Sequence, residues 1–107
     1  MINIKESAKL QCIIAISSIV GIKENVSNFK IGKTRQNLDE RFNSGYSDEY
    51  DEIKTIFKSD DTDLIDWLEK TLIDFYKKAY PIKCDNNQIG GGPNGATQIY
   101  IVIKYKK

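Results

Sequence analysis

The side chains in this sequence that suit chemistry on a phosphate lie far apart in the chain. Residues 28–42 read NFKIGKTRQNLDERF: Lys33 ends an apolar-alternating segment, and Arg41 follows eight residues later among helix-forming residues. An arginine held on a short helix can bind a phosphate through two parallel hydrogen bonds. An exposed helical arginine is the alternative. The chain has no histidine, so carboxylate, lysine, tyrosine, arginine or a metal-bound water must supply any catalysis.

Glu69 is the second chemically suggestive residue. Ile65 and Ile73 are four residues before and after it, and Leu68 directly precedes it. These neighbours predict a carboxylate beside the buried stripe of a helix, where it needs a partner. One carboxylate with water and a substrate phosphate is a normal Mg²⁺ site. The alternative, equally favoured by the residues, is an ion pair with Lys70, Lys77 or Arg41.

The Gly32-Lys33-Thr34 run does not complete a Walker phosphate loop. That loop needs a glycine five residues before Gly32, where this chain has Ser27. No parallel-sheet pattern surrounds the run either. A nucleotide hydrolase of this kind is therefore excluded.

The elements that must position these residues can be traced from the hydrophobic pattern. The β-branched, apolar run over residues 12–22 predicts a buried central strand, forming a hairpin with a second strand around Phe29 and Ile31. Asn37, with Glu40 three residues later, predicts the start of a helix whose Leu38 and Phe42 face the core. Residues 1–9 fit either a strand or a helix.

The second half of the chain predicts two more strands and one long helix. Ile53, Thr55 and Phe57 share one face of a short strand. The sequence SDDTD then caps a helix with a stripe at Leu64, Leu68, Leu72, Phe75 or Tyr76, and Ala79. The Gly-rich run GGGPNG fits a tight turn better than a phosphate cradle. The last strand, over residues 97–105, fits a lysine-protected edge strand or a nucleic-acid contact.

These elements predict one domain over residues 1–107. It is an α+β fold with a small mixed or antiparallel sheet flanked by helices, in the order β-β-α-β-α-β. The net charge is +1, but residues 48–69 hold nine acids against two bases, a net of −7, so the rest sums to +8. A polyanion could dock on the basic part, but on charge alone a solvated mixed surface is the preferred interpretation.

The composition also bears on location. The two cysteines, Cys12 and Cys84, form no disulfide framework or zinc pattern, which favours a reducing, cytoplasmic setting. Residues 10–22 resemble a signal peptide only superficially: serines interrupt them, no cleavage site follows, and they are too short to span a bilayer. We therefore expect no membrane association. Oligomeric state stays open, with a dimer as one option.

The order of these elements resembles the GIY-YIG endonuclease superfamily from about Ser17 to Gly92. FKIGKTRQNLDERF is similar to the second signature strand and arginine helix of that family, LIDWLEKTLIDFY to its metal-glutamate helix, and CDNNQIGGG to the following Asn-containing loop. The resemblance implies that Arg41 binds the scissile phosphate and that Glu69 holds one Mg²⁺ or Mn²⁺ ion. The further substrate contacts that it implies are Lys33, Arg35, Asn86 and Asn87.

The two signature tyrosines of that superfamily are absent where the resemblance expects them. The first falls near residues 17–19, Ser-Ser-Ile, and the second position holds Lys30. Such tyrosines position or deprotonate the attacking water. Lys30 is a candidate base only if burial lowers its pKa. Tyr46, Tyr50 and Tyr100 are the tyrosines that fit a replacement in space.

The sequence therefore carries two hypotheses about function. The first is a small, stand-alone, metal-dependent DNA endonuclease; its size and its Lys-, Ile- and Asn-rich composition favour a phage, viral or mobile-element origin. The second is a catalytically degenerate protein with the same fold that binds nucleic acid or protein. A variant of the second is an inhibitor that uses the acidic residues 48–69 to mimic nucleic acid.

Overall fold

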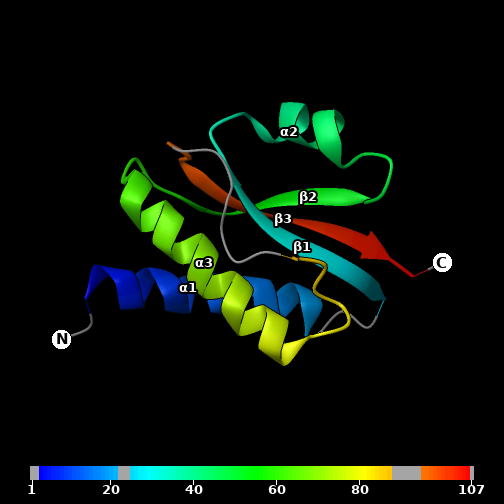
Figure 1. The fold of residues 1–107 in the computed structure, drawn as a ribbon, viewed down its shortest axis with the longest axis horizontal. Coiled ribbons are helices and arrows are strands. Elements are labelled where there is room, and N and C mark those ends of the chain that lie inside the picture. Colours follow the sequence, from blue (N-terminus) through cyan, green and yellow to red (C-terminus); the bar gives the residue numbers. More distant parts are fainter. Residues whose placement is uncertain (1–2, 22–24, 88–94, 107) are drawn as a thin grey trace.

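The computed structural model describes residues 3–21, 25–87 and 95–106. In chain order these form helix α1 (Ile4–Val20), strand β1 (Val26–Thr34), helix α2 (Leu38–Gly45), strand β2 (Glu52–Lys58), helix α3 (Thr62–Ala79) and strand β3 (Gln98–Tyr105). The predicted α+β class is confirmed. The predicted order is wrong at its start, because a helix takes the place of the first strand (Figure 1).

Helix α1 covers most of the segment predicted as a buried strand. The side chain of Asn3 caps it by accepting a hydrogen bond from the backbone N–H of Glu6 at 2.9 Å. The β-branched run hides the helical period, because the exposed Ile14 makes the segment look apolar on every side. The buried residues do recur at helical spacing: Ala8, Cys12, Ile16, Ile19 and Val20.

The sheet has the order β1-β3-β2, and β3 is antiparallel to both neighbours. The predicted hairpin is therefore wrong: β1 pairs with the last strand of the chain and not with residues 12–22. The edge-strand interpretation of β3 is wrong as well, because β3 lies in the centre and is buried from Gln98 to Ile103. Such continuous burial is typical of a strand covered on both faces.

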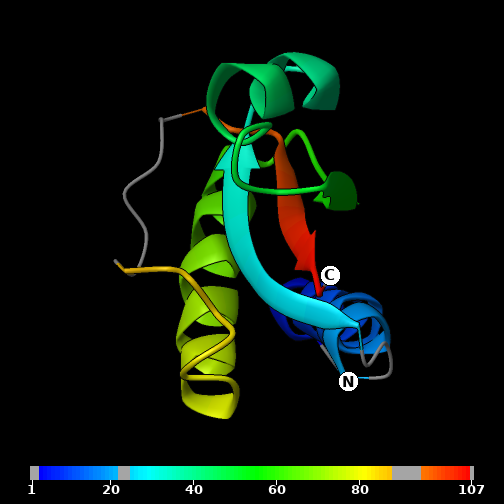
Figure 2. The same cartoon turned by 90° about the vertical axis from the view of Figure 1, so that its right-hand side faces the viewer.

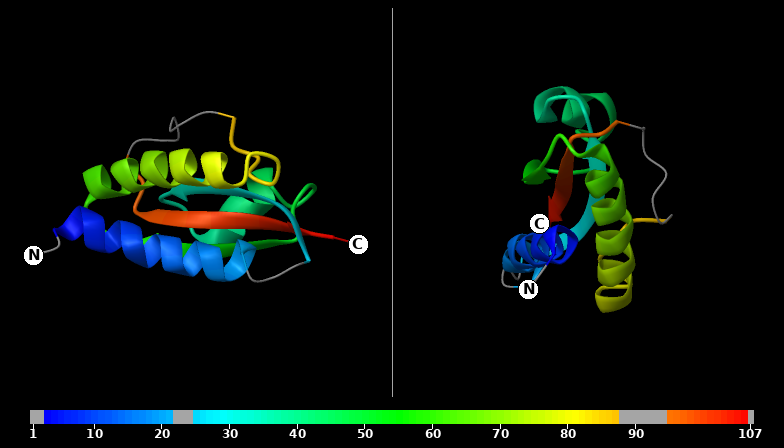
Figure 3. Two further views of the ribbon diagram at one scale, coloured as in Figure 1. Left: turned by 90° about the horizontal axis from the view of Figure 1, so that it is seen from below. Right: turned by 90° about the vertical axis from the view of Figure 1, so that its left-hand side faces the viewer.

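The helices cover the two faces of the sheet unequally. Figure 3 shows α1 and α3 side by side across one face, and Figure 2 shows α2 on the side opposite α1. The larger core joins α1, α3 and the sheet through residues such as Ile16, Leu68 and Ile101. The smaller core lies under α2, where Leu38 and Phe42 pack on Tyr50, Tyr100 and Val102.

Strand β2 does not present one uniform face. Its pairing with β3 shifts between Thr55 and Phe57, which turns the side chains after the shift to the other face. Ile53 consequently packs in the smaller core and Phe57 against the larger one. The predicted shared face of Ile53, Thr55 and Phe57 is therefore wrong at Phe57.

The two helices predicted from capping residues are confirmed. Asn37 caps α2 by accepting from the backbone N–H of Glu40, and Asp61 caps α3 by accepting from that of Leu64. The α3 stripe buries Tyr76 and leaves Phe75 41% exposed. These two helices bring Arg41 and Glu69 to the sheet.

Candidate active site

Arg41 lies against two tyrosine hydroxyls on the α2 side of the sheet. Its Nε is 3.3 Å from the hydroxyl of Tyr100, and its Nη2 is 3.2 Å from that of Tyr46. The two hydroxyls are 2.7 Å apart, so each can donate to the other. The guanidinium carbon also lies 4.8 Å from the ring centre of Tyr46. Position 41, one turn into α2 after the partly buried Leu38, makes this contact possible.

The three side chains form one hydrogen-bonded cation cluster. Burial raises the pKa of the Tyr100 phenol, and the hydrogen bond with Tyr46 raises it further, while Arg41 opposes both. Burial lowers the pKa of Arg41, but the two tyrosines outweigh it and hold the pKa above its usual value. At neutral pH the cluster therefore carries a fixed positive charge, and the Tyr100 phenol keeps its proton. It suits binding of an anion and hydrogen-bond donation to it.

A second cluster forms where Lys33 of β1 meets two carboxylates of α3. The Nζ of Lys33 is 2.7 Å from Oδ1 of Asp66 and 3.9 Å from Oε1 of Glu69. The side chains of Lys33 and Glu69 are only 4% and 6% exposed, whereas Asp66 is one-third exposed. Glu69 is thus buried beside the core stripe, as predicted, but its cation is Lys33, which the sequence did not suggest.

The carboxylate of Glu69 is incompletely satisfied. Its Oε1 is buried and has no hydrogen-bond partner. Burial raises the pKa of Glu69, and the positive charge and backbone N–H of Lys33 only partly offset this effect. A buried carboxylate with an unused oxygen is held at a cost in free energy, which is typical of a binding site.

The second cluster offers donors that fit a hard divalent cation. Oε1 of Glu69 is free of hydrogen bonds, and Asp66 supplies another carboxylate one turn earlier on the same helix face. Among residues 3–21, 25–87 and 95–106 no group of three or more His, Cys, Asp or Glu side chains could hold a metal. A cation here would therefore need water and a substrate phosphate to complete its ligands.

The two clusters meet at the peptide that joins Gly32 and Lys33. Gly32 pairs with Tyr100 in the sheet, and the ring of Tyr100 lies across it: a Cβ built on Gly32 would be 2.3 Å from the Tyr100 hydroxyl oxygen. On the next residue, the backbone N–H of Lys33 acts on Glu69. A glycine is required here because only its missing side chain lets the tyrosine lie over the strand. The phenol and the carboxylate thus flank one peptide.

The free edge of β1 is closed by the segment that follows α3. The N–H of Phe29 donates to Lys83, and its carbonyl accepts from Asp85. The side chain of Asn86 bonds both backbone groups of Ile31, at 2.9 and 2.7 Å. The backbone N–H and C=O groups of the odd-numbered residues of β1 point to this edge. The backbone N–H of Lys33 therefore points there too, toward Glu69. Asn86 thus supports the strand that carries the site, whereas Asn87 is exposed.

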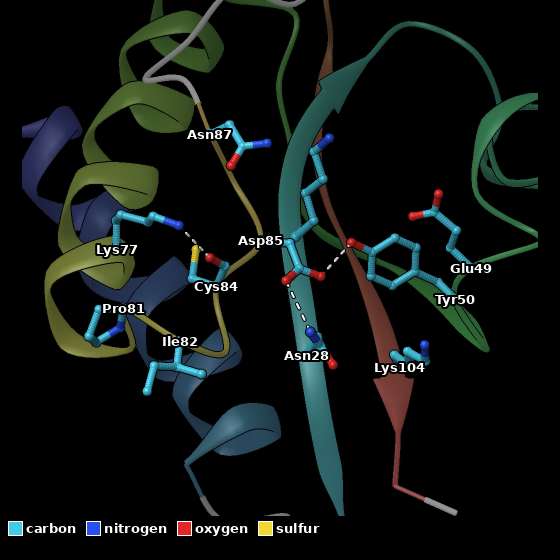
Figure 4. Close-up of a pocket in the computed structure, with 11 residues that line it drawn as sticks. Asn28, Glu49, Tyr50, Lys77, Pro81, Ile82, Cys84, Asp85, Asn87 and Lys104 are labelled. Atoms are coloured by element: carbon cyan, nitrogen blue, oxygen red, sulfur yellow. Dashed lines mark hydrogen bonds between the residues drawn. The ribbon is translucent and has the colours of Figure 1, made fainter.

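A polar pocket of about 550 Å³ opens beside β1 and the 81–87 segment (Figure 4). Asp85 is fixed in it, because its carboxylate accepts from Tyr50 at 2.7 Å and from Asn28 at 3.1 Å. Three lysines from different elements line the pocket: Lys30, Lys77 and Lys104. Lys30 also lies 5.8 Å from the ring centre of Tyr46, which joins the pocket to the Arg41 cluster.

The predicted site residues therefore divide into separate places. Arg41 and Lys30 lie on the α2 side of the sheet, and Lys33 and Glu69 lie on the α3 side. Arg35 is exposed, near Gly95. The sequence named Tyr46 and Tyr100 only as options and missed Asp66. The signal for Asp66 was its spacing, three residues before Glu69, which puts both on one helix face.

Comparisons of this chain with protein-family models, with curated proteins and with solved structures find no match. In the part of the chain that the structure describes, no helix has the length and apolar character needed to cross a membrane.

Cys12 and Cys84 are both free and buried, and burial raises the pKa of the Cys12 thiol to about 11. The arrangement of the two clusters is thus the observation from which a function must be argued.

Proposed function

We propose that the protein is a divalent-metal-dependent DNA endonuclease of the GIY-YIG type. The observation that carries the proposal is the contact of Arg41 with the hydroxyl of Tyr100, on the strand that pairs with Lys30-Ile31-Gly32. The sequence lacked a signature tyrosine near residues 17–19. In our proposal Tyr100, from the other end of the chain, takes that role.

A rotated order of elements accounts for this tyrosine. The superfamily resemblance calls for a Gly-Ile-Tyr strand paired with the second signature strand. In this chain the partner of β1 is β3, which reads Gln98-Ile99-Tyr100, and Tyr100 is the register partner of Gly32. The first signature strand has then moved to the C-terminal end of the domain, and helix α1 stands where that strand was expected.

Each cluster then has a role in phosphodiester hydrolysis. Arg41 binds the scissile phosphate and stabilises the charge that develops on it. Tyr100 and Tyr46 orient the phosphate or the attacking water by donating hydrogen bonds. The raised pKa of the buried Tyr100 phenol does not suit that group to act as a base. Glu69 and Asp66 hold the cation. A bound Mg²⁺ or Mn²⁺ would polarise the phosphate and lower the pKa of a bound water.

The polar pocket supports a path for the DNA strand on the α2 side. Its lysines, together with Arg41, give positive charge along β1 and β3. Such charge binds the phosphates next to the cleaved one without reading sequence. Two carboxylates, those of Glu49 and Asp85, also line this pocket.

The test is nicking of supercoiled plasmid with Mg²⁺ or Mn²⁺. Wild-type protein should nick, and Arg41→Ala, Glu69→Gln and Tyr100→Phe should each lose about 10²–10³-fold in rate, as expected for groups that stabilise the transition state. Lys78→Met is the matched control, because Lys78 forms an exposed pair with Asp74 at 3.1 Å. Folded wild-type protein that nicks with neither metal rules the proposal out, and so does nicking that all three variants retain.

One observation favours the second candidate, a nucleic-acid-binding protein without catalysis. The ammonium of Lys33 already neutralises the two carboxylates that would hold the cation. If it stays there with DNA bound, the protein binds phosphate and cleaves nothing. Salt-sensitive DNA affinity without nicking is the result that this candidate predicts.

A further inference from the structure

We propose that Lys33 is an internal counter-cation: its ammonium keeps a divalent ion away from Asp66 and Glu69 until a substrate phosphate draws it off. The inference rests on the proposed function, and it assigns to one residue the control of metal binding. Metal and DNA would then bind cooperatively, and the free protein would hold the metal poorly.

The geometry of the second cluster carries this inference. Lys33 Nζ sits 2.7 Å from Asp66 and 3.9 Å from Glu69, next to both carboxylates that would hold a cation. Oε1 of Glu69 has no hydrogen-bond partner despite its burial. A lysine placed only to satisfy Glu69 would donate to that oxygen. Lys33 donates to Asp66 instead and leaves a buried acceptor open.

The side chain of Lys33 can leave because its stem is flexible and its charge is compact. A phosphate held by Arg41 and Tyr100 lies on the α2 side of the sheet, and Lys33 lies on the α3 side, so the ammonium must pass around the edge of β1 at the Gly32–Lys33 peptide to reach it. The ammonium gains a phosphate partner there, and both carboxylates are released for a cation. Because binding couplings are reciprocal, DNA must then raise metal affinity by the factor by which metal raises DNA affinity.

Metal affinity is the direct readout, and it needs no catalysis. Mn²⁺ binding is measured by the loss of its free-ion EPR signal in wild type, Lys33→Met, Lys78→Met and Glu69→Gln. Without DNA, Lys33→Met should bind Mn²⁺ at least tenfold more tightly than wild type, because methionine keeps the volume and removes the competing charge. Lys78→Met should match wild type, and Glu69→Gln should bind most weakly.

A second arm uses wild-type protein and so does not depend on whether the Lys33 variant folds. A short DNA duplex with phosphorothioate linkages should tighten Mn²⁺ binding to wild type at least tenfold. The Mn²⁺ that the duplex alone binds is measured separately and subtracted. The duplex should leave the Mn²⁺ affinity of Lys33→Met nearly unchanged. Equal Mn²⁺ affinity in free wild-type protein and in wild-type protein that has bound the duplex overturns the inference, as does a folded Lys33→Met that binds Mn²⁺ no better than wild type.

These outcomes separate the inference from the proposed function. A wild-type protein that nicks plasmid but shows neither effect is a nuclease in which Lys33 has no such role. If the protein never nicks but Lys33→Met binds Mn²⁺ more tightly than wild type, the inference about Lys33 holds and the proposed nuclease function is ruled out. If the duplex does not bind at all, the comparison of Lys33→Met with wild type still decides the inference.

Discussion

Gly32 is the residue on which the geometry of the site depends most closely. A Cβ there would be 2.3 Å from the Tyr100 hydroxyl oxygen and 2.4 Å from the ring carbon that bears it. Tyr100 is buried and cannot retreat without leaving Arg41. Glycine at this position is thus a requirement of the site and not only of the strand, which would accept alanine.

Gly32→Ala should therefore displace the phenol of Tyr100 and separate it from Arg41. Crowding of this kind costs about 1–3 kcal/mol in unfolding free energy. Nicking should fall about 100-fold, the effect of misplacing a reacting group by about 1 Å. Denaturant unfolding and plasmid nicking measure the two effects. Gly32→Ala with wild-type stability and rate would mean that Tyr100 does not lie over this glycine.

Glu69 makes the free energy of unfolding depend on pH, and its burial determines whether that free energy rises or falls with pH. Because burial raises its pKa, the folded protein holds the proton more tightly than the unfolded chain. The free energy of unfolding should therefore fall as pH rises from the unfolded pKa of about 4.3 through the folded pKa, by about 1.4 kcal/mol per unit between the two. Glu69→Gln should remove this fall and be more stable than wild type near pH 7.

Thermal unfolding of both proteins across the acid and neutral range checks this prediction. Each 1 kcal/mol gained by Glu69→Gln should raise Tm by about 4–8 °C for a domain of this size. A Glu69→Gln protein that is less stable than wild type at neutral pH would show that the charge of Glu69 is fully compensated.

At the level of single residues, part of the site could be predicted from the sequence. Helical spacing alone put Glu69 beside the core and Arg41 at the margin of a buried face. The partners of these residues, Lys33 and Tyr100, come from strands, and strand pairing between distant segments leaves no local spacing to detect. The site was therefore predictable residue by residue and not as a constellation.

Helix α1 is the element that the sequence misrepresents most. Its capping pair, Asn3 and Glu6, was a readable start signal. The run of β-branched residues outweighed it, because such residues favour strands in general. Packing against α3 decides the outcome: Tyr76 donates to the carbonyl of Ile13 and accepts a hydrogen bond from the hydroxyl of Ser17.

A pair of substitutions distinguishes the helix from the predicted strand. In a strand Ile14 and Ile16 would share one face, whereas in α1 Ile16 is fully buried and Ile14 is 70% exposed. Ile16→Ala should cost about 2–5 kcal/mol, and Ile14→Ala should change stability by less than about 0.5 kcal/mol. Urea unfolding measures both. Equal costs would contradict the helix.

The closed edge of β1 gives a second prediction at the scale of elements. Asn86→Ala leaves the N–H and the carbonyl of Ile31 without partners, at about 1–3 kcal/mol for each buried group. Asn87→Ala is the matched control, since Asn87 is exposed and next in sequence. Hydrogen exchange at the Ile31 amide should speed up only in Asn86→Ala. Unchanged exchange there would mean that the edge is held by other contacts.

For the molecule as a whole, the central strand is also the last in the chain. Neither β1 nor β2 can pair until β3 takes its place between them. The sequence predicted the α+β class, five of the six elements and their caps, because these depend on local spacing. It could not predict the strand order, because that order is set by the joint packing of α1 and α3 on a sheet built from distant segments.

The central claim is that the Arg41 cluster and the Glu69 cluster act as one site around the Gly32–Lys33 peptide. Plasmid nicking rates for wild type, Arg41→Ala, Glu69→Gln and the double variant test it most directly. Groups that act as a unit are strongly non-additive, so the double variant should be about as slow as the slower single variant. Two losses that multiply would contradict a shared site, and a folded wild-type protein that never nicks would contradict the nuclease itself.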